Sequence, residues 1–197
     1  MPSPKFPVTD DHIHIDPVNG RGIEAAKDFL RAGGTHFFLV SKPSWSLSVH
    51  PFAGSDFSSV FDETLRVAGL VEETGVGVYA VLGVHPAEIG RLSERMPLAE
   101  AVEVMKAGID LAAGYVQEGK AVALKSGRPH YDVSPEVWRG SNEILAHALE
   151  KAAECKCALQ IHAENGPCND IAEMARNTGF PLERLVKHYG SPDPLLH

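Results

Sequence analysis

Six short apolar segments, each separated from the next by a single amphipathic stretch, restrict the fold of this 197-residue chain more than any other feature. The predicted strands are residues 8–15, 36–40, 76–84, 121–125, 157–162 and 185–188. Strands that are apolar almost throughout and alternate with single helices are typical of a parallel sheet with helices packed against it. The alternation leaves two architectures, the doubly wound sheet and the (β/α)8 barrel.

The stretches between these segments carry apolar residues at helical spacing. Glycines follow several of them, and Ser134 with Pro135 is a typical helix start, with a capping hydroxyl before a proline in the first turn. Pro97 suits the first turn of another helix. The predicted helical faces cover residues 23–30, 57–71, 98–116, 135–152 and 171–175.

Polar residues follow nearly every predicted strand, and they decide between the two architectures. A doubly wound sheet is expected to have a Gly-rich phosphate loop after its first strand, whereas residues 12–17 contain no glycine. A barrel gathers its chemistry at the carboxyl ends of its strands. These ends carry His12, His14, Lys42, His85, Lys125, Arg128, His130, His162, Glu164 and His188. We therefore predict an α/β chain folded as one TIM-type barrel domain over residues 1–197.

The number of predicted strands is smaller than that of a complete barrel, which has eight strands in about 250 residues. The sequence therefore predicts a barrel truncated after about six βα units, without strands seven and eight. An incomplete barrel exposes the edges of its first and last strands, and such edges favour pairing with another chain. We expect self-association through these edges, weak metal binding, and weak or absent turnover by this chain.

Composition excludes several classes of protein. The 26 acidic residues outnumber the 18 basic ones, and the net charge of −8 disfavours loose coating of a polyanion, although bound metal ions can supply positive charge locally. The longest apolar run, residues 76–84, is far shorter than the roughly 18 residues of a membrane span, and residues 1–11 show no signal-peptide core. The three cysteines have no Cys-x-x-Cys spacing. We expect a cytoplasmic protein with no membrane partner.

Histidines suggest a metal site. On a strand, side chains at i and i+2 share a face, so His12 and His14 can bind one divalent ion through ring nitrogens. A barrel brings His162 and His188, at the ends of later strands, to the same mouth. The alternatives are that the first pair is packed or exposed, and that the later two bond to backbone carbonyls. Convergence of all four would decide for the metal site.

Four motifs resemble the TatD-related metal-dependent hydrolases of the amidohydrolase superfamily. They are Asp-His-Ile-His-Ile-Asp at 11–16, Leu-Gly-Val-His-Pro at 82–86, Gln-Ile-His at 160–162 and Val-Lys-His at 186–188. The resemblance covers essentially the whole chain, although the His-x-His also recurs in the polymerase and histidinol phosphatase group. It implies one or two divalent metal ions, of Zn, Mn, Mg or Fe, held by His12, His14, His162 and His188.

The chain departs from the family pattern in two places. The usual Glu at the end of the fourth strand is replaced by Lys125, which resembles the carboxylated lysine that bridges two metals in other amidohydrolases. A desolvated lysine beside cations can take up carbon dioxide, but Lys125 can equally be a plain cation that pairs with a carboxylate or a substrate phosphate. The usual Asp after an eighth strand is absent, since Asp193 follows His188 too closely.

Further residues at the predicted mouth suit catalysis and substrate binding. His85 and His130 are candidates for protonating a leaving group or orienting ligands, and buried structural hydrogen bonds are the alternative. Arg128 and Lys42 are placed to bind an anionic substrate, unless they are simply solvated. Trp45 either lines a pocket for a flat group or covers the barrel top.

Three functions follow from these residues. The first is metal-activated hydrolysis of a phosphodiester, with a DNA end or an anionic small molecule as substrate. The second is hydrolysis of a lactone, cyclic amide or phosphotriester with a carboxylated Lys125. The third is a non-catalytic or incomplete metal-binding fragment. A nucleic-acid-binding module without catalysis fits less well, because the chain is acidic and shows no interleaved basic and aromatic motif.

Overall fold

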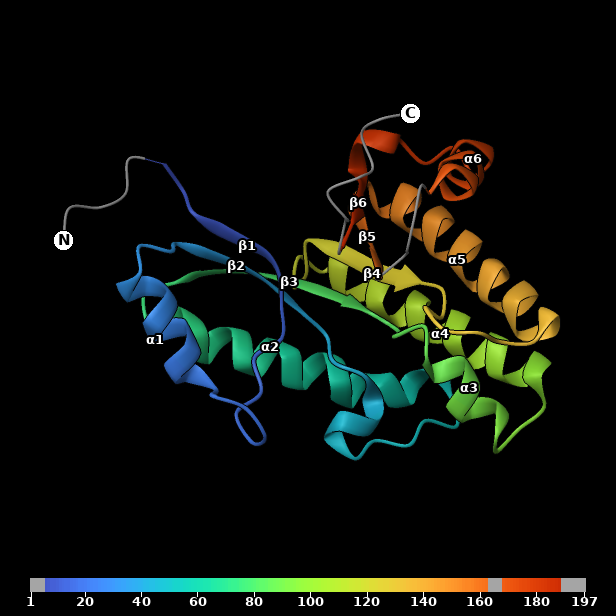
Figure 1. Ribbon diagram of the computed structural model, residues 1–197, viewed down its shortest axis with the longest axis horizontal. Coiled ribbons are helices and arrows are strands. Elements are labelled where there is room, and N and C mark those ends of the chain that lie inside the picture. The colour runs from blue at the N-terminus through green and yellow to red at the C-terminus, as the bar shows by residue number, and fades with distance from the viewer. Residues whose placement is uncertain (1–5, 163–167, 189–197) are drawn as a thin grey trace.

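A computed structural model describes residues 6–162 and 168–188, which form one parallel sheet of six strands in chain order (Figure 1). The strands are β1 (Thr9–Ile13), β2 (His36–Val40), β3 (Gly77–Gly83), β4 (Ala123–Gly127), β5 (Ala158–His162) and β6 (Leu185–Lys187). Each strand pairs with the next in the chain, so the sheet curls into a half-barrel with the connectivity of a TIM barrel. The predicted fold class is confirmed.

Helices pack on one face of the curled sheet (Figure 1). They are α1 (Ile23–Arg31), α2 (Ser58–Glu72), α3 (Glu88–Ser93), α4 (Leu98–Gln117), α5 (Pro135–Cys155) and α6 (Asn169–Asn177), with 3-10 turns η1 (Ser44–Leu47), η2 (Gly54–Phe57) and η3 (Leu182–Arg184). The predicted cap of α5 is formed, because Ser134 Oγ accepts the Val137 N–H at 3.3 Å. Pro97 is the N-cap of α4 rather than part of its first turn, and α3 was not predicted.

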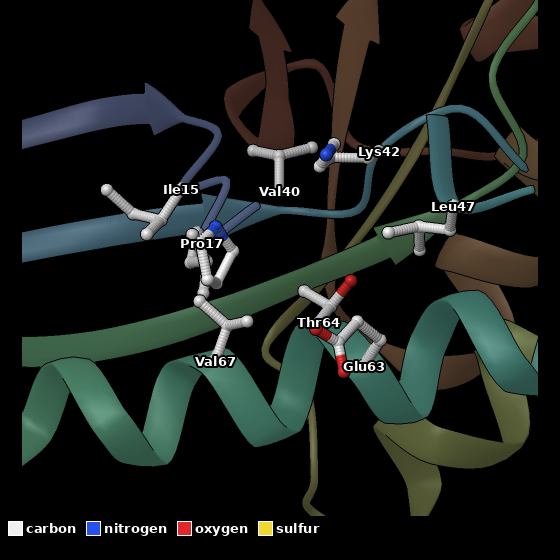
Figure 2. Close-up of a pocket in the computed structure, with 9 residues that line it drawn as sticks. Ile15, Pro17, Val40, Lys42, Leu47, Glu63, Thr64 and Val67 are labelled. Atoms are coloured by element: carbon white, nitrogen blue, oxygen red, sulfur yellow. The ribbon is translucent and has the colours of Figure 1, made fainter. Parts of the chain in front are cut away.

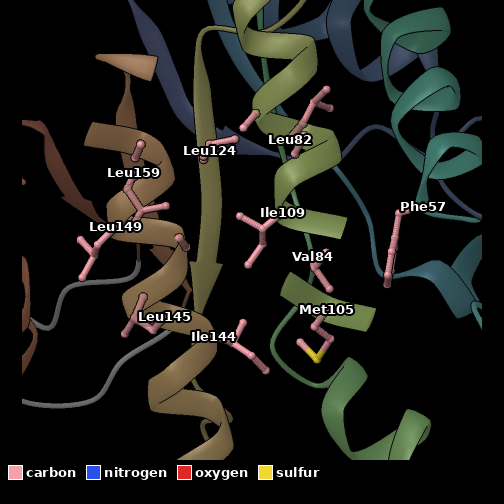
Figure 3. Packing of buried hydrophobic residues seen from close by; sticks show 14 of the residues in the cluster. Phe57, Leu82, Val84, Met105, Ile109, Leu124, Ile144, Leu145, Leu149 and Leu159 are labelled. Atoms are coloured by element: carbon pink, nitrogen blue, oxygen red, sulfur yellow. The ribbon is translucent and has the colours of Figure 1, made fainter. Parts of the chain in front are cut away.

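The main core lies between the sheet and helices α4 and α5 (Figure 3). Leu82, Leu124 and Leu159 come from the three central strands and are fully buried. Facing them, Ile109 of α4 and Leu145 of α5 fill the space between helix and sheet. Burial of large aliphatic side chains on both layers makes this part of the sheet a rigid support.

The opposite, concave face of the sheet is the inside of the barrel. Successive strand residues point to opposite faces, so Val81 and Ala123 lie on this inner face and pack with Val40. Close approach of β3 and β4 requires a glycine, because a Cβ at Gly83 would lie 1.9 Å from the carbonyl oxygen of Lys125. Lys125 is thereby held against β3, with its side chain directed inside the barrel toward the carboxyl end.

The edges of the sheet are less regular than its centre. The pairing of β1 with β2 shifts register between Asp10 and Ile13, and β6 has three residues, all half-buried. In residues 6–162 and 168–188, β1 and β6 each have one neighbouring strand. None of the helices in this part of the chain is long and apolar enough to cross a membrane.

Candidate functional site

Five histidines gather at the carboxyl end of the sheet. The ring of His12 lies 5.1 Å from that of His14 and stacks at 3.5 Å on that of His188. The ring of His162 lies 6.2 Å from that of His188 and 4.4 Å from that of His85, measured between centroids. Side chains from β1, β5 and the ends of β3 and β6 therefore form one imidazole cluster.

The tautomer of His12 is fixed by Gln160 on β5. Gln160 Nε2 donates to the backbone carbonyl of Asp11 at 2.7 Å, and since a carbonyl can only accept, the amide oxygen must face His12. His12 Nδ1 donates to that oxygen at 3.0 Å. The lone pair is therefore on Nε2, which is buried without a hydrogen-bond partner in the described residues.

His14 is fixed in the same way by a backbone group. Its Nδ1 donates to the carbonyl oxygen of Val40 at 2.8 Å, so its lone pair is also on Nε2. Burial and the nearby Lys125 ammonium lower the pKa of His14 to about 4, and the same two causes lower that of His12 to about 3. Both rings are therefore neutral at pH 7, the state in which imidazole binds a metal.

Lys125 lies on β4, in the centre of the sheet beneath the imidazole cluster. It is 1% exposed and sits between Gly83 and Gln160 in the sheet register. Its Nζ has no hydrogen-bond partner among the described residues, and burial lowers its pKa to about 7. A large fraction of Lys125 is therefore an uncharged amine at neutral pH.

His162 and His85 form the second half of the cluster. Both ring nitrogens of His162 are buried and without a hydrogen-bond partner in the described chain, and burial followed by the Lys125 charge lowers its pKa to about 3. The same causes lower the pKa of His85 to about 2. His85 Nδ1 accepts the backbone N–H of Ala87 at 3.2 Å, so neutral His85 carries its hydrogen on Nε2.

The cluster has the donor chemistry of a divalent metal site. Neutral imidazoles with a fixed tautomer and an unpartnered nitrogen, as at His12, are what a cation of this kind binds. As the side chains stand, no group of three or more His, Cys, Asp or Glu in residues 6–162 and 168–188 is arranged to hold a metal ion. The stacked rings of His12 and His188 would have to separate for both to coordinate. The predicted ligand set therefore stays a prediction.

Lys42, a predicted substrate-binding residue, pairs with Asp16. It also borders a small cavity between the strands and α2 (Figure 2). Asp16 also accepts hydrogen bonds from the backbone N–H groups of Asn19 and Val18. Together with the bond from Lys42, they lower the pKa of Asp16. The cavity beside Lys42 has a volume of about 20 Å³, enough for about one water molecule. Its lining residues are Ile15, Pro17, Leu39, Val40, Lys42, Leu47, Glu63, Thr64 and Val67.

Arg128 is buried rather than open to solvent. Its guanidinium donates to Asp170 of α6 at 2.5 Å and to Asn142 of α5 at 3.1 Å, and it lies 4.5 Å from the ring centroid of Trp138. These contacts join the end of β4 to two helices. A role in binding substrate stays a prediction for Arg128 as it does for Lys42.

The other predicted residues border the cluster. His130 lies 5.3 Å from His162, and Trp45 meets His85 edge-on at 5.6 Å between ring centroids. Glu164 and Asp193 lie outside the described residues. Gln160 was missed as a site residue, although its position two residues before His162 on the same strand places both on one face.

Comparison with known proteins gives the family of this chain. A family model described as TatD related DNase matches residues 9–195. An uncharacterized protein of Methanocaldococcus jannaschii is 36% identical over 191 residues, which make up 93% of this chain and 65% of that protein. The chain therefore spans 65% of the length of this curated relative.

Two solved structures share the fold. A TatD-like protein from Archaeoglobus fulgidus superposes with a TM-score of 0.62 at 21% identity, covering 91% of this chain and 67% of that one. A mutant of a PTE-like lactonase from Deinococcus radiodurans superposes with a TM-score of 0.54 at 15% identity, covering 93% of this chain and 59% of that one. At these identities the likeness concerns the barrel fold.

Proposed function

Because this chain belongs to the family of TatD related DNases, we propose that it is a metal-dependent hydrolase that cleaves a phosphodiester bond at the imidazole cluster. The proposal is based on the tautomers of His12 and His14. His12 and His14, on adjacent positions of one strand face, are both neutral and both have Nδ1 fixed as a donor, so that both Nε2 lone pairs are available.

The chain supplies ligands for one or two divalent cations. His12, His14, His162 and His188 would hold the metal, and a carboxylated Lys125 would add an anionic oxygen donor. When bound, a cation of this kind activates water, polarises the scissile phosphoryl oxygen and neutralises charge that develops on it. Partial burial of the cluster strengthens each of these electrostatic interactions.

His85 contributes in its neutral form. Its low pKa makes it a poor proton donor at pH 7, but its Nε2–H can donate a hydrogen bond to negative charge that develops on the substrate. The Ala87 N–H holds the ring in this tautomer. We therefore propose that His85 stabilises charge rather than protonating the leaving group, and that His130 completes the same side of the site.

Hydrolysis of a lactone or phosphotriester is the second candidate, and Lys125 favours it. An uncharged Nζ can attack the carbon of carbon dioxide, forming an N–C bond while an electron pair moves to oxygen and the nitrogen loses its proton to solvent. The Lys125 Nζ suits this step, because it is buried and has no hydrogen-bond partner among the described residues. Incubation with 13C-bicarbonate and metal, followed by NMR and intact mass measurement, tests whether the carbamate forms.

The proposed function is tested by metal titration calorimetry and by cleavage assays on the full chain loaded with Zn or Mn. Substrates are single-stranded DNA, bis(p-nitrophenyl) phosphate and a panel of lactones. We expect slow but measurable cleavage of the phosphodiesters, because the barrel is incomplete, and a loss of about 100-fold or more in the variant His12→Gln/His14→Gln.

His147→Gln is the matched control, because His147 lies on α5 and bonds to Asp110 outside the cluster. It should bind metal and cleave substrate as the parent does. Lactone turnover without phosphodiester cleavage would replace the first function by the second. Failure of the parent to bind any divalent metal would refute both.

A further inference from the structure

A second cavity lies beside the imidazole cluster and is lined by polar and charged residues. Its volume is about 220 Å³, against about 20 Å³ for the cavity at Lys42. It is formed by η1 and the segment after it on one side, and by α3 and the following turn on the other. The lining residues are Ser44, Trp45, Val49, His50, Glu88, Arg91, Glu94 and Arg95.

Two arginines of this cavity each stack on an aromatic ring. Arg91 Cζ lies 4.4 Å from the ring centroid of Trp45, and Arg95 Cζ lies 4.9 Å from that of Phe52. Within residues 6–162 and 168–188, neither guanidinium forms an ion pair with a carboxylate. Arg95 also donates to the backbone carbonyls of Arg91 and Pro51, at 3.4 and 3.3 Å, and these neutral acceptors leave its charge uncompensated. Both charges can therefore attract an anionic ligand, and each guanidinium is oriented by the ring beneath it.

The acidic residues of the cavity reduce this charge only in part, although the Glu88 carboxylate lies within electrostatic reach of both arginines. Glu88 is buried, and its two carboxylate oxygens accept the backbone N–H and the hydroxyl of Ser44 at 2.7 and 2.9 Å. Glu94 is exposed at the rim and makes no ion pair with either arginine in the described chain. Glu94 would weaken binding of an anion without preventing it.

Phe52 lies outside the lining of the cavity, next to Arg95, and adds an exposed aromatic surface there. Its side chain is 64% exposed, and it belongs to a segment whose backbone is held by Asp56, which accepts the N–H groups of Phe52 and Ala53. A fixed and exposed aromatic ring next to an arginine is the combination on which unpaired bases stack while their phosphates meet positive charge.

Trp45 connects this cavity to the cluster. One side of its indole carries Arg91, and its ring meets that of His85 edge-on at 5.6 Å. A chain with one phosphate at the imidazole cluster therefore has Trp45 and Arg91 next along its path, and Arg95 with Phe52 after them. Interleaved cations and aromatic rings at successive steps fit a single-stranded polynucleotide.

We infer that Arg91, Arg95, Trp45 and Phe52 form a binding subsite for the single-stranded DNA segment that flanks the scissile bond. The phosphates bind the two guanidinium groups, and the bases stack on Phe52 and on the exposed part of Trp45. This inference rests on the proposed function, since it assigns a strand of nucleotides as the substrate of the same cluster.

The test is direct binding of fluorescein-labelled hexathymidylate to the full chain in a chelating buffer, which prevents cleavage. Fluorescence anisotropy gives the affinity at several salt concentrations. We expect Arg91→Gln/Arg95→Gln to bind at least about 10-fold more weakly. The slope of log affinity against log salt concentration should become shallower by about 0.7 for each lost phosphate contact. Phe52→Ala should bind about 5- to 100-fold more weakly through loss of stacking.

Three further variants separate binding from folding. Arg91→Lys/Arg95→Lys keeps both charges, so its salt dependence should equal that of the parent. Glu94→Gln should bind more tightly, because it removes a negative charge from the rim. Arg139→Gln, on an exposed arginine of α5 that pairs with Glu136, should bind as the parent does.

The inference is overturned if the parent does not bind hexathymidylate, or if Arg91→Gln/Arg95→Gln and Phe52→Ala bind it as tightly as the parent. Hydrolysis of bis(p-nitrophenyl) phosphate by the metal-loaded parent is measured separately. That substrate has no flanking strand, so its cleavage tests the proposed function whatever the binding result.

Discussion

Strands β3 and β4 are held in the sheet very differently from strands β1 and β6. The carboxyl half of β3 and the whole of β4 are buried, with helices on one face and inner-face side chains on the other. Strand β1 is mostly exposed or half-buried and has a register shift, and β6 has three half-buried residues. The centre of the sheet is therefore rigid, whereas its edges are weakly held.

The imidazole cluster uses both regions. Lys125 and Gln160 come from buried positions of β4 and β5, while His12 belongs to β1 and His188 follows β6. Gln160 joins the two regions by bonding to both His12 and the backbone of Asp11. The centre of the sheet therefore positions its edge, and the predicted ligands are divided between the two regions, with Lys125 and His162 on β4 and β5 and the other histidines at β1 and β6. Pairing of these edges with a second chain remains a prediction.

Acidification should destabilise the imidazole cluster, which joins the two regions, and it has the largest expected effect. The folded-state pKa values of His12, His14, His85 and His162 are about 3, 4, 2 and 3, below the ordinary 6.5. Below about pH 6.5 the unfolded chain therefore binds more protons than the folded chain, so the free energy of unfolding decreases as the pH is lowered. Because these rings are only half-buried, solvent screening reduces the effect of the shifts, and between pH 7 and 5 the metal-free protein should lose on the order of 5 kcal/mol.

Urea denaturation at a series of pH values measures this loss. His162→Gln should take up about one proton fewer on unfolding below pH 6.5, whereas His147→Gln on α5 should leave the slope unchanged. The depressed pKa of Lys125 adds a slope of the same sign between about pH 7 and 10.5. Stability that does not change between pH 7 and 5 would contradict neutral burial of the cluster.

Gly83→Ala should disrupt the rigid centre. The added Cβ would lie 1.9 Å from the carbonyl oxygen of Lys125, and its three nearest atoms are all backbone atoms of that residue, which cannot move aside as a flexible side chain could. We expect a loss of about 4 kcal/mol or more in the free energy of unfolding. Gly114→Ala in α4 is the control, since nothing lies within 4 Å of its Cβ, and it should stabilise the helix by up to about 1 kcal/mol.

Truncation of one aliphatic side chain in each region gives a finer comparison. Leu82 of β3 is fully buried, and Leu82→Ala should cost about 3 kcal/mol. Ile13 of β1 is half-buried, and Ile13→Ala should cost about 1 kcal/mol, because less apolar surface is lost. Equal losses in urea denaturation would show that the edge is as well packed as the centre.

The sequence predicts the apolar strand segments well and the polar end of β4 poorly. The predicted bounds of β2 match the structure, because His36–Val40 is an apolar run between clear breaks. For β4 the prediction, 121–125, comes two residues too early, since Ser126 and Gly127 are strand residues that no apolar pattern reveals. Helix α3 has six residues, too few for a helical period to be recognised.

Positions of the site residues could be predicted, but their partners could not. A barrel brings strand ends together, which is enough to place His12 beside His188. The bond between His12 and Gln160 spans 148 residues, and the stacks at Arg91 and Arg95 join segments about 40 residues apart. Such contacts depend on the curvature of the sheet and the path of its loops, neither of which has a local signal.

Gln160→Leu tests the bond between the rigid centre and the edge, and its expected effect is the smallest of the four. Leucine fills the same buried volume but leaves His12 Nδ1 without an acceptor, so the ring can rotate or change tautomer. We expect zinc affinity, measured by calorimetry, to fall about 10- to 100-fold, which corresponds to about 1.4 to 2.7 kcal/mol.

Two further variants make this result specific. Gln160→Glu keeps an oxygen acceptor for His12 and should retain zinc affinity better than Gln160→Leu, although its buried carboxylate also changes the local charge. Gln117→Leu, at the end of α4, should leave zinc affinity unchanged. If Gln160→Leu bound zinc as tightly as Gln117→Leu, then β1 would orient His12 without help from β5, and the edge would be better ordered by itself than its exposure suggests.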